Sequence, residues 1–220
     1  MRCILAPVLL ALALPLAGAG PKPHLINLGP ATTAKLFVGP SEKESLDLKI
    51  RPLYVDGKLK DFTTGEPHDV TDRSFVVRRV YRINDLLPED PKAPPRWKWQ
   101  RDGWLVVDRS TGHVGPVALP EFDPYYSVAS WYRDYVAYCG VSDDGEKLYA
   151  MVAQLGRRKP VLKHDLGAAH GRDLPDSECP APQWQRAPMR VSFQPAGGQK
   201  LTFAVRGHSA DVAEADDEQK

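Results

Sequence analysis

The sequence predicts an all-β protein, a single domain of about ten short antiparallel strands arranged as a sandwich or a barrel. Three observations lead to this fold class. Short runs alternate apolar and polar residues, as half-buried strands do. These runs are rich in β-branched and aromatic residues, which favour strands. Turn-forming Asp-Gly, Gly and Pro residues separate the runs at near-regular spacing, which is typical of all-β folds.

The first predicted strands begin at Leu46. Leu46, Leu48 and Ile50 alternate with charged residues, which indicates a strand with one buried face. The next run ends at Asp56-Gly57, and a second alternating run follows it. Asp-Gly between two such runs predicts a tight hairpin, because both residues tolerate the positive φ angles of a type I′ turn.

The longest run of β-type residues extends from Ser74 to Ile83, with Phe75, Val77 and Tyr81 in one phase. Two further runs, around Trp97 and Trp104, flank a turn at residues 101–103. The remaining predicted strands lie at 135–141, 147–153 and 161–166, and in a last hairpin around Gly197-Gly198.

The segment from Tyr135 to Ala150 resembles a blade segment of β-propeller repeats of the TolB type. Those repeats carry a Ser-x-Asp-Gly-Lys turn, and here Ser142 to Lys147 has the lysine displaced by one position. A propeller requires at least four blades of about 40 residues, and the chain contains no repeat of that period. We therefore interpret the segment as an ordinary hairpin, and no function follows from the resemblance.

Residues 124–132 fit either one short helix or a further strand. Asp123-Pro124 resembles a helix N-cap followed by proline at the first helical position. Tyr125, Val128 and Tyr132 then recur at helical spacing. Both alternatives remain open at this point.

Residues 1–19 have the pattern of a cleaved signal peptide. Arg2 precedes an apolar stretch from Ile4 to Leu16, and Ala17-Gly18-Ala19 suits signal peptidase. The stretch contains two prolines and is shorter than the roughly 20 apolar residues of a membrane span. We therefore expect an exported protein, periplasmic or extracellular, that has no transmembrane segment after cleavage.

Three segments are expected after the signal peptide. Residues 20–44, rich in Gly, Pro and Thr, predict an extended arm; residues 45–206 form the globular domain; and residues 207–220 predict an acidic disordered tail. Cleavage removes Arg2 from the 29 Lys and Arg residues, which leaves 28 against 28 Asp and Glu. This neutral balance argues against a nucleic-acid partner, since such proteins are strongly basic.

Cys139 and Cys179 are the two cysteines that cleavage leaves, because Cys3 is removed with the signal peptide. An even pair in an oxidising compartment predicts a disulfide. Two free thiols are the alternative. The sequence has neither a Cys-x-x-Cys motif nor the clustered Cys and His residues of a zinc site, so we expect no metal and no cofactor.

Aromatic residues are the candidate ligand contacts. Trp97 and Trp99 share one face if they lie on one strand. Trp104 lies close to them in the sequence, and Trp131 belongs to a second aromatic cluster that extends from Tyr125 to Tyr138. An exposed platform of these rings could stack on sugars, whereas most aromatic residues of all-β domains belong to the core.

Two basic runs stand out. Arg157, Arg158 and Lys159 lie in a predicted turn and form a candidate basic surface patch for an anionic polymer or acidic partner. Arg78 and Arg79 are adjacent on a strand and must face opposite ways. One of them must lie on the more buried face, where we expect a carboxylate partner such as Asp69, Asp72 or Asp85.

The sequence favours a non-enzymatic binding or scaffolding role in the cell envelope or extracellular space, with an envelope protein or a glycan as the unknown partner. No nucleophile-elbow, zinc-protease or phosphate-loop motif is present. The alternative is a secreted hydrolase or carbohydrate-active protein. It requires a histidine, a carboxylate and an aromatic wall to meet in one pocket, and the candidate histidines are His68, His113, His164 and His170.

Overall fold

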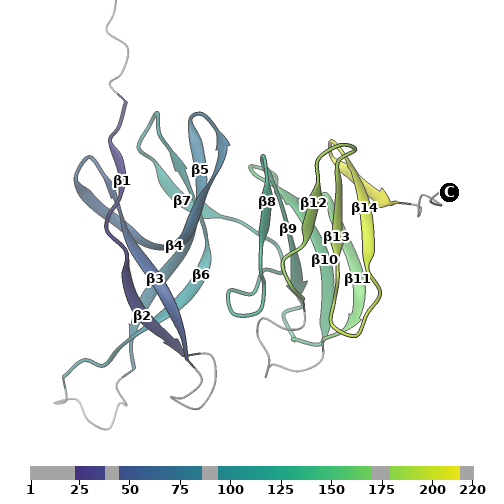
Figure 1. The fold of residues 1–220 in the computed structure, drawn as a ribbon, viewed down its shortest axis with the longest axis horizontal. Helices are drawn as coiled ribbons and strands as arrows, with labels where there is room; N and C mark the ends of the chain where they lie inside the picture. The colour runs from purple at the N-terminus through teal and green to yellow at the C-terminus, as the bar shows by residue number, and fades with distance from the viewer. Residues whose placement is uncertain (1–22, 38–44, 86–93, 170–178, 214–220) are drawn as a thin grey trace, which may run out of the picture.

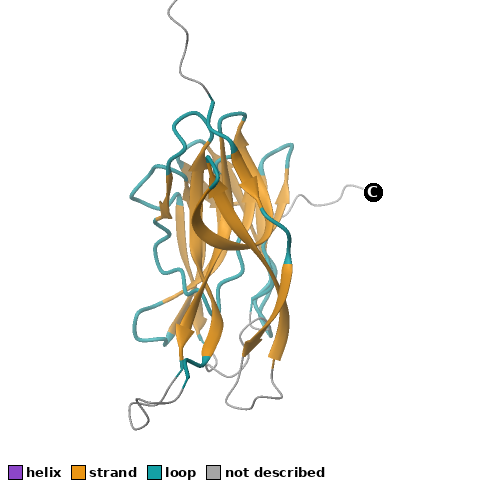
Figure 2. Cartoon of the chain, turned by 90° about the vertical axis from the view of Figure 1, so that its left-hand side faces the viewer, coloured by secondary structure: helices purple, strands orange, loops and turns teal. Residues whose placement is uncertain are grey.

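The computed structural model describes residues 23–37, 45–85, 94–169 and 179–213, so the predicted signal peptide lies outside the described residues. The described part is all-β, which confirms the predicted fold class, and its fifteen strands form three sheets. Figure 1 shows a barrel-like half at the left and a sandwich half at the right, and Figure 2 shows strands and loops only. None of the described residues forms a helix with the length and apolarity that a membrane crossing requires.

The barrel half contains the first seven strands. Their bounds are β1 (Ile26–Leu28), β2 (Thr32–Phe37), β3 (Ser45–Val55), β4 (Lys58–Thr71), β5 (Ser74–Asn84), β6 (Trp97–Asp108) and β7 (Val114–Val117). Strands β2 to β6 pair in sequence order, and a parallel contact between Leu36 and Trp99 joins β2 to β6 and closes the ring. Strand β1 pairs with β3, and β7 pairs with β6.

The hairpin predicted at Asp56-Gly57 is confirmed. It joins β3 to β4, with Val55 opposite Lys58. Asp56 and Gly57 have φ angles of 51° and 74°, as the tight hairpin turn requires.

The barrel core lies at the end of the barrel near this hairpin. Leu53, Phe75, Val77, Leu105 and Val107 pack together there, each at most 4% exposed. Further along β5 the buried phase changes, because Val80 is fully buried while Tyr81 is 36% exposed. A register shift against β6 lies between Arg78 and Val80. Residues of one alternating set in β5 are therefore buried at one end of the strand, as Phe75 and Val77 are, and exposed at the other end, as Tyr81 is.

The sandwich half consists of two four-stranded antiparallel sheets. The first contains β8 (Ser130–Tyr132), β9 (Tyr135–Val141), β10 (Lys147–Gln154) and β11 (Leu162–Ala168), and the second contains β12 (Gln183–Gln185), β13 (Arg190–Phe193), β14 (Leu201–Arg206) and β15 (Ser209–Val212). Ala137, Ala150 and Val152 of the first sheet pack against Phe193 and Phe203 of the second.

Strands β9 and β10 are buried on both faces. The faces turned away from the sandwich core carry Val136, Tyr138 and Met151, all of them fully buried. These residues pack against Phe122, from the chain that connects the two halves, and Trp131 of β8. The first sheet is thus the central layer of the molecule.

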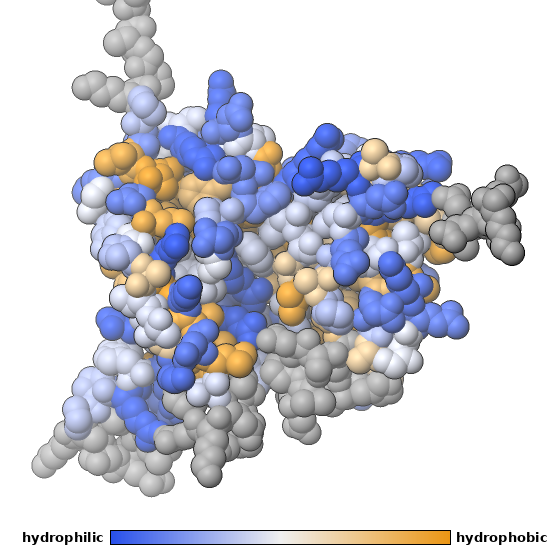
Figure 3. All heavy atoms as spheres, in the orientation of Figure 1, coloured by the Kyte–Doolittle hydropathy of each residue, from blue (hydrophilic) through white to orange (hydrophobic). Residues whose placement is uncertain are grey.

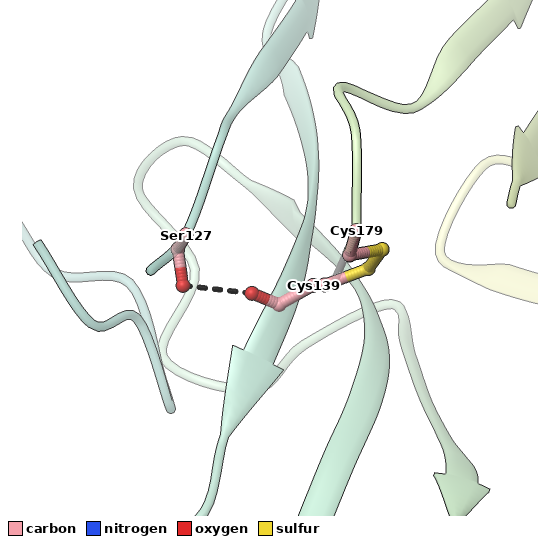
Figure 4. The surroundings of a disulfide bond; sticks show 3 residues. All are labelled: Ser127, Cys139 and Cys179. Atoms are coloured by element: carbon pink, nitrogen blue, oxygen red, sulfur yellow. Dashed lines mark hydrogen bonds between the residues drawn. A yellow bond between two sulfur atoms is a disulfide. The ribbon is translucent and has the colours of Figure 1, made fainter. Parts of the chain in front are cut away.

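The predicted disulfide between Cys139 and Cys179 is confirmed. It joins β9 to the segment before β12, and the two Cα atoms are 6.2 Å apart. Both cysteines are nearly buried, at 3% and 6% exposed. Figure 4 shows that the Cys139 carbonyl also accepts a hydrogen bond from Ser127 Oγ, at 2.7 Å.

Both ends of the globular domain extend further than the sequence indicated. Residues 26–28 and 32–37 of the predicted arm are strands of the barrel sheet, because they pair with residues 53–55 and 45–50 of β3. At the other end, Ser209–Val212 of the predicted tail forms β15 and pairs with β14. Residues 38–44 and 214–220 of these two segments lie outside the described residues.

The possible helix near 124–132 does not form. Asp123 does cap one turn, since its Oδ1 accepts hydrogen bonds from the amides of Tyr125 and Tyr126. The turn ends there because Ser130 already pairs with Ala137 as part of β8.

Removing the disulfide should destabilise the protein. The bond closes a loop across 40 residues, and loss of a native disulfide typically costs about 2–5 kcal/mol. We expect the double variant Cys139→Ala/Cys179→Ala to lose this amount of unfolding free energy in urea denaturation. Dithiothreitol should destabilise the wild type similarly and leave the double variant unchanged; equal urea midpoints for all four samples would contradict the pairing.

Candidate functional site

Arg78 lies at the junction between the barrel and the sandwich, on the outward face of β5. It is only 8% exposed. Its guanidinium donates hydrogen bonds to the carbonyls of Pro124, at 2.7 Å, and Ser127, at 3.4 Å. Its Cζ lies 4.9 Å from the centre of the Phe122 ring and 5.9 Å from that of Trp104. A buried cation here contacts carbonyl dipoles and aromatic faces, both of which stabilise positive charge.

The expectation for the arginine pair is therefore confirmed in part. One arginine is buried, but the contacts described above differ from the expected carboxylates. Asp69 pairs with Arg109 and Asp85 with Lys98. Arg79 faces the opposite way and forms ion pairs with Asp61, at 2.8 Å, and Asp102, at 3.0 Å.

Two tryptophans of the predicted ligand platform belong to this junction. Trp104 of β6 and Trp131 of β8 meet edge to face, with ring centres 5.4 Å apart. His68 of β4 stacks on Trp131 at 6.0 Å, and its Nε2 hydrogen-bonds the Arg133 carbonyl at 2.9 Å. These rings hold the two halves together and are not arranged as an open platform.

Trp97 and Trp99 lie elsewhere, at the far end of the barrel strands. Trp97 is 52% exposed and the Arg82 guanidinium covers its ring at 4.8 Å. Trp99 is half-buried against Phe62, with ring centres 5.2 Å apart. The four tryptophans predicted as ligand contacts are thus divided between two places.

The chain between β7 and β8, residues 118–129, is called the crossover loop here. Ser127 is 2% exposed and fixes the loop, because it accepts a hydrogen bond from the Asp123 amide and donates one to the Cys139 carbonyl. Tyr138 donates to the Pro120 carbonyl at 2.6 Å. Burial raises the pKa of the Tyr138 hydroxyl well above its usual range, so this donor keeps its proton at any physiological pH.

The middle of the crossover loop approaches β9 very closely. Glu121 has a φ of 53°, and its carbonyl accepts a hydrogen bond from the Val141 amide. A Cβ atom at Gly140 would lie 3.0 Å from the Glu121 backbone and 2.8 Å from Met151, so glycine is needed here. Lys163 donates to the Glu121 carboxylate at 2.6 Å, which raises the pKa of the lysine.

A pocket of about 260 Å³ opens between the crossover loop and the barrel, and we call it the junction pocket. It is lined by two tyrosines, a glutamine, an arginine, an aspartate and two apolar residues, namely Tyr81, Tyr125, Gln100, Arg101, Asp123, Leu36 and Pro124. Both tyrosines are 36% exposed. The Tyr81 hydroxyl donates to Gln100 at 2.8 Å, and the Asp123 carboxylate is held by loop amides. The pocket therefore combines aromatic rings with planar polar groups, and hydrogen bonds hold Tyr81, Gln100 and Asp123 in place.

Sequence reasoning missed Tyr81, Gln100 and Arg101. The alternation of β5 places Tyr81 in the phase of the core residues Phe75 and Val77. The change of buried phase along β5 brings Tyr81 to the surface, and only the pairing of β5 with β6 reveals it. In the sequence, Tyr125 belongs to an aromatic cluster and Asp123 to a predicted helix N-cap. Neither pattern indicates that the two residues line a pocket.

The described histidines do not converge on a pocket. His68 contacts the junction, His164 packs on Phe203 at 5.2 Å, and His113 lies beside Gly115. His170 lies outside the described residues. One His–carboxylate pair was not foreseen: His24, in the chain before β1, lies 2.7 Å from the Asp56 carboxylate on the exposed β3–β4 turn. Within the described ranges, no group of three or more His, Cys, Asp or Glu residues is arranged to hold a metal.

Replacing Arg78 should weaken the protein through the junction. Arg78→Met removes the donors to the part-buried Pro124 carbonyl and the buried Ser127 carbonyl, and leaving a buried polar group unsatisfied costs about 1–3 kcal/mol. We expect that loss of unfolding free energy in urea denaturation. Arg82→Met, on the same strand but exposed, removes only a surface contact with Trp97 and should cost less than about 1 kcal/mol. A loss for Arg78→Met no larger than for Arg82→Met would contradict the role of the junction.

Comparison with known proteins gives no match: no family model fits the chain, and neither a curated protein nor a solved structure is similar to it. Any functional conclusion therefore depends on the geometry of the site.

Proposed function

We propose that this chain is an exported, non-enzymatic binding protein that recognises a glycan in the junction pocket. The observation that carries the proposal is the pairing of Tyr81 and Tyr125 with Gln100, Arg101 and Asp123 in one concavity. Aromatic rings stack on the apolar faces of sugars, while planar polar side chains donate to and accept from hydroxyls. The pocket is smaller than the roughly 300–1,000 Å³ of pockets for drug-sized ligands, so it suits one sugar unit of a chain.

Rigidity supports a binding role. The pocket wall formed by the crossover loop is fixed by Arg78, Ser127 and Tyr138. A ligand that enters a preformed pocket does not have to order it first, which preserves affinity. Export is supported by the signal-peptide pattern of residues 1–19 and by a disulfide, which is typical of oxidising compartments.

The hydrolase alternative receives less support. Acid–base hydrolysis requires a histidine or a second carboxylate beside the pocket. Asp123 is the acidic residue of the junction pocket, and its Oδ1 accepts two hydrogen bonds from backbone amides. The described histidines lie apart from it.

Binding should depend on the two tyrosines. The mature protein should bind a subset of an oligosaccharide array, and titration calorimetry should give the affinity for the strongest ligand. Tyr81→Ala and Tyr125→Ala should each weaken that affinity at least tenfold, about 1.4 kcal/mol, because each removes a stacking surface.

Trp97→Ala is the matched control, since Trp97 is the more exposed aromatic residue and lies outside the pocket. Its affinity should stay within twofold of the wild type. Absence of any array signal would overturn glycan recognition. Loss of binding in Trp97→Ala, with Tyr81→Ala unaffected, would move the site to the barrel end.

A further inference from the structure

Three turns of the sandwich meet at one end, the upper end of the right-hand half in Figure 1. They are the β8–β9 turn at Arg133-Asp134, the β10–β11 turn at residues 155–161, and the β14–β15 turn at Gly207-His208. The Leu155 amide donates to the Asp134 carbonyl at 2.8 Å, which joins the first two turns.

The third turn is fixed to the other two by side chains. The Tyr135 hydroxyl donates to the Gly207 carbonyl at 2.8 Å. Gln154 bridges the turns, since its amide nitrogen donates to Asp134 at 2.7 Å and its oxygen lies 3.1 Å from His208 Nδ1. The relative positions of the three turns are therefore set by hydrogen bonds.

These turns, together with the last residue of β14, carry a concentration of positive charge that we call the basic end. It comprises five exposed cationic side chains, Arg133, Arg157, Arg158, Lys159 and Arg206. His208 is also exposed, and Asp134 is the one carboxylate in these turns. Figure 3 shows strongly hydrophilic side chains gathered at this upper edge.

The five cations differ from four other basic residues in their pairing, and from Lys49, Lys58 and Lys60, which also form no ion pair with a described carboxylate, in lying together at one end of the sandwich. Arg79, Lys98, Arg109 and Lys163 each form an ion pair with a carboxylate. Within the part of the chain that the structure describes, none of the five at the basic end does so. The mature chain has 28 basic and 28 acidic residues, so positive charge gathered at one end is not the result of an overall excess. Such a local cluster of cations favours an external anionic partner.

We propose that the basic end binds a linear polyanion that carries repeated phosphate or sulfate groups. Four of the five cations are arginines, whose planar guanidinium groups suit bidentate contacts with such oxyanions. The charges are spread over three turns, so a polymer with several anions would engage more of them than a single ion. This surface is separate from the junction pocket and does not depend on glycan recognition there.

The test measures binding of the mature protein to long-chain inorganic polyphosphate and to heparin at about 0.15 M salt, with poly-glutamate as a third probe. The variant is Arg157→Gln/Arg158→Gln/Lys159→Gln. The control, Lys49→Gln/Lys58→Gln/Lys60→Gln, removes the same charge from exposed positions of the barrel half. We expect at least tenfold weaker binding to polyphosphate or heparin for the variant and less than a twofold change for the control.

The two polymers distinguish a phosphate partner from a sulfate partner, and preference for either supports the proposal. Equal weakening of the variant and the control would overturn it, because it would show only a general attraction to positive charge. Stronger binding of poly-glutamate than of both other probes would also overturn it, in favour of an acidic protein partner. Tyr81→Ala should bind polyphosphate as the wild type does, which separates this result from the glycan proposal.

Discussion

The contact of Arg78 with the crossover loop is the interaction on which the rest of the structure depends. Arg78 is only 8% exposed, so its guanidinium needs hydrogen-bond acceptors within the protein. The carbonyls of Pro124 and Ser127 accept these hydrogen bonds. These contacts place the crossover loop against β5. The junction pocket exists only because Asp123, Pro124 and Tyr125 of that loop stand opposite Tyr81 of the barrel.

A continuous series of contacts extends from Arg78 into the sandwich. Ser127 links the loop to the Cys139 carbonyl on β9, and the disulfide links Cys139 to Cys179 beside the second sheet. Strand β9 tolerates burial on both faces because its residues from Tyr135 to Gly140 are apolar or small enough for both layers. A change at the junction is therefore expected to affect the loop first and the sandwich core less.

Local signals predicted much of the fold and little of the site. Asp56-Gly57 determines its hairpin through its own φ angles, and the pairing of Cys139 with Cys179 followed from an even number of cysteines in an expected oxidising compartment. Of the two alternatives left open for residues 124–132, the helix does not form, because pairing of β8 with β9 outweighs the cap at Asp123. The four tryptophans do not lie on one surface, because Trp104 packs against Trp131 at the junction and a register shift between β5 and β6 lies between Trp104 and Trp99. Such a shift arises from tertiary packing and leaves no clear mark in one sequence.

Amide hydrogen exchange of Arg78→Met and the wild type tests most directly whether Arg78 positions the crossover loop. Local opening exposes only the amides whose support is lost. In the variant, protection at Ser127, whose amide donates to Asp123, should fall at least tenfold more than at Val77 or Val152 in the two cores. Unchanged protection at Ser127, or an equal loss at all three amides, would contradict this role of Arg78.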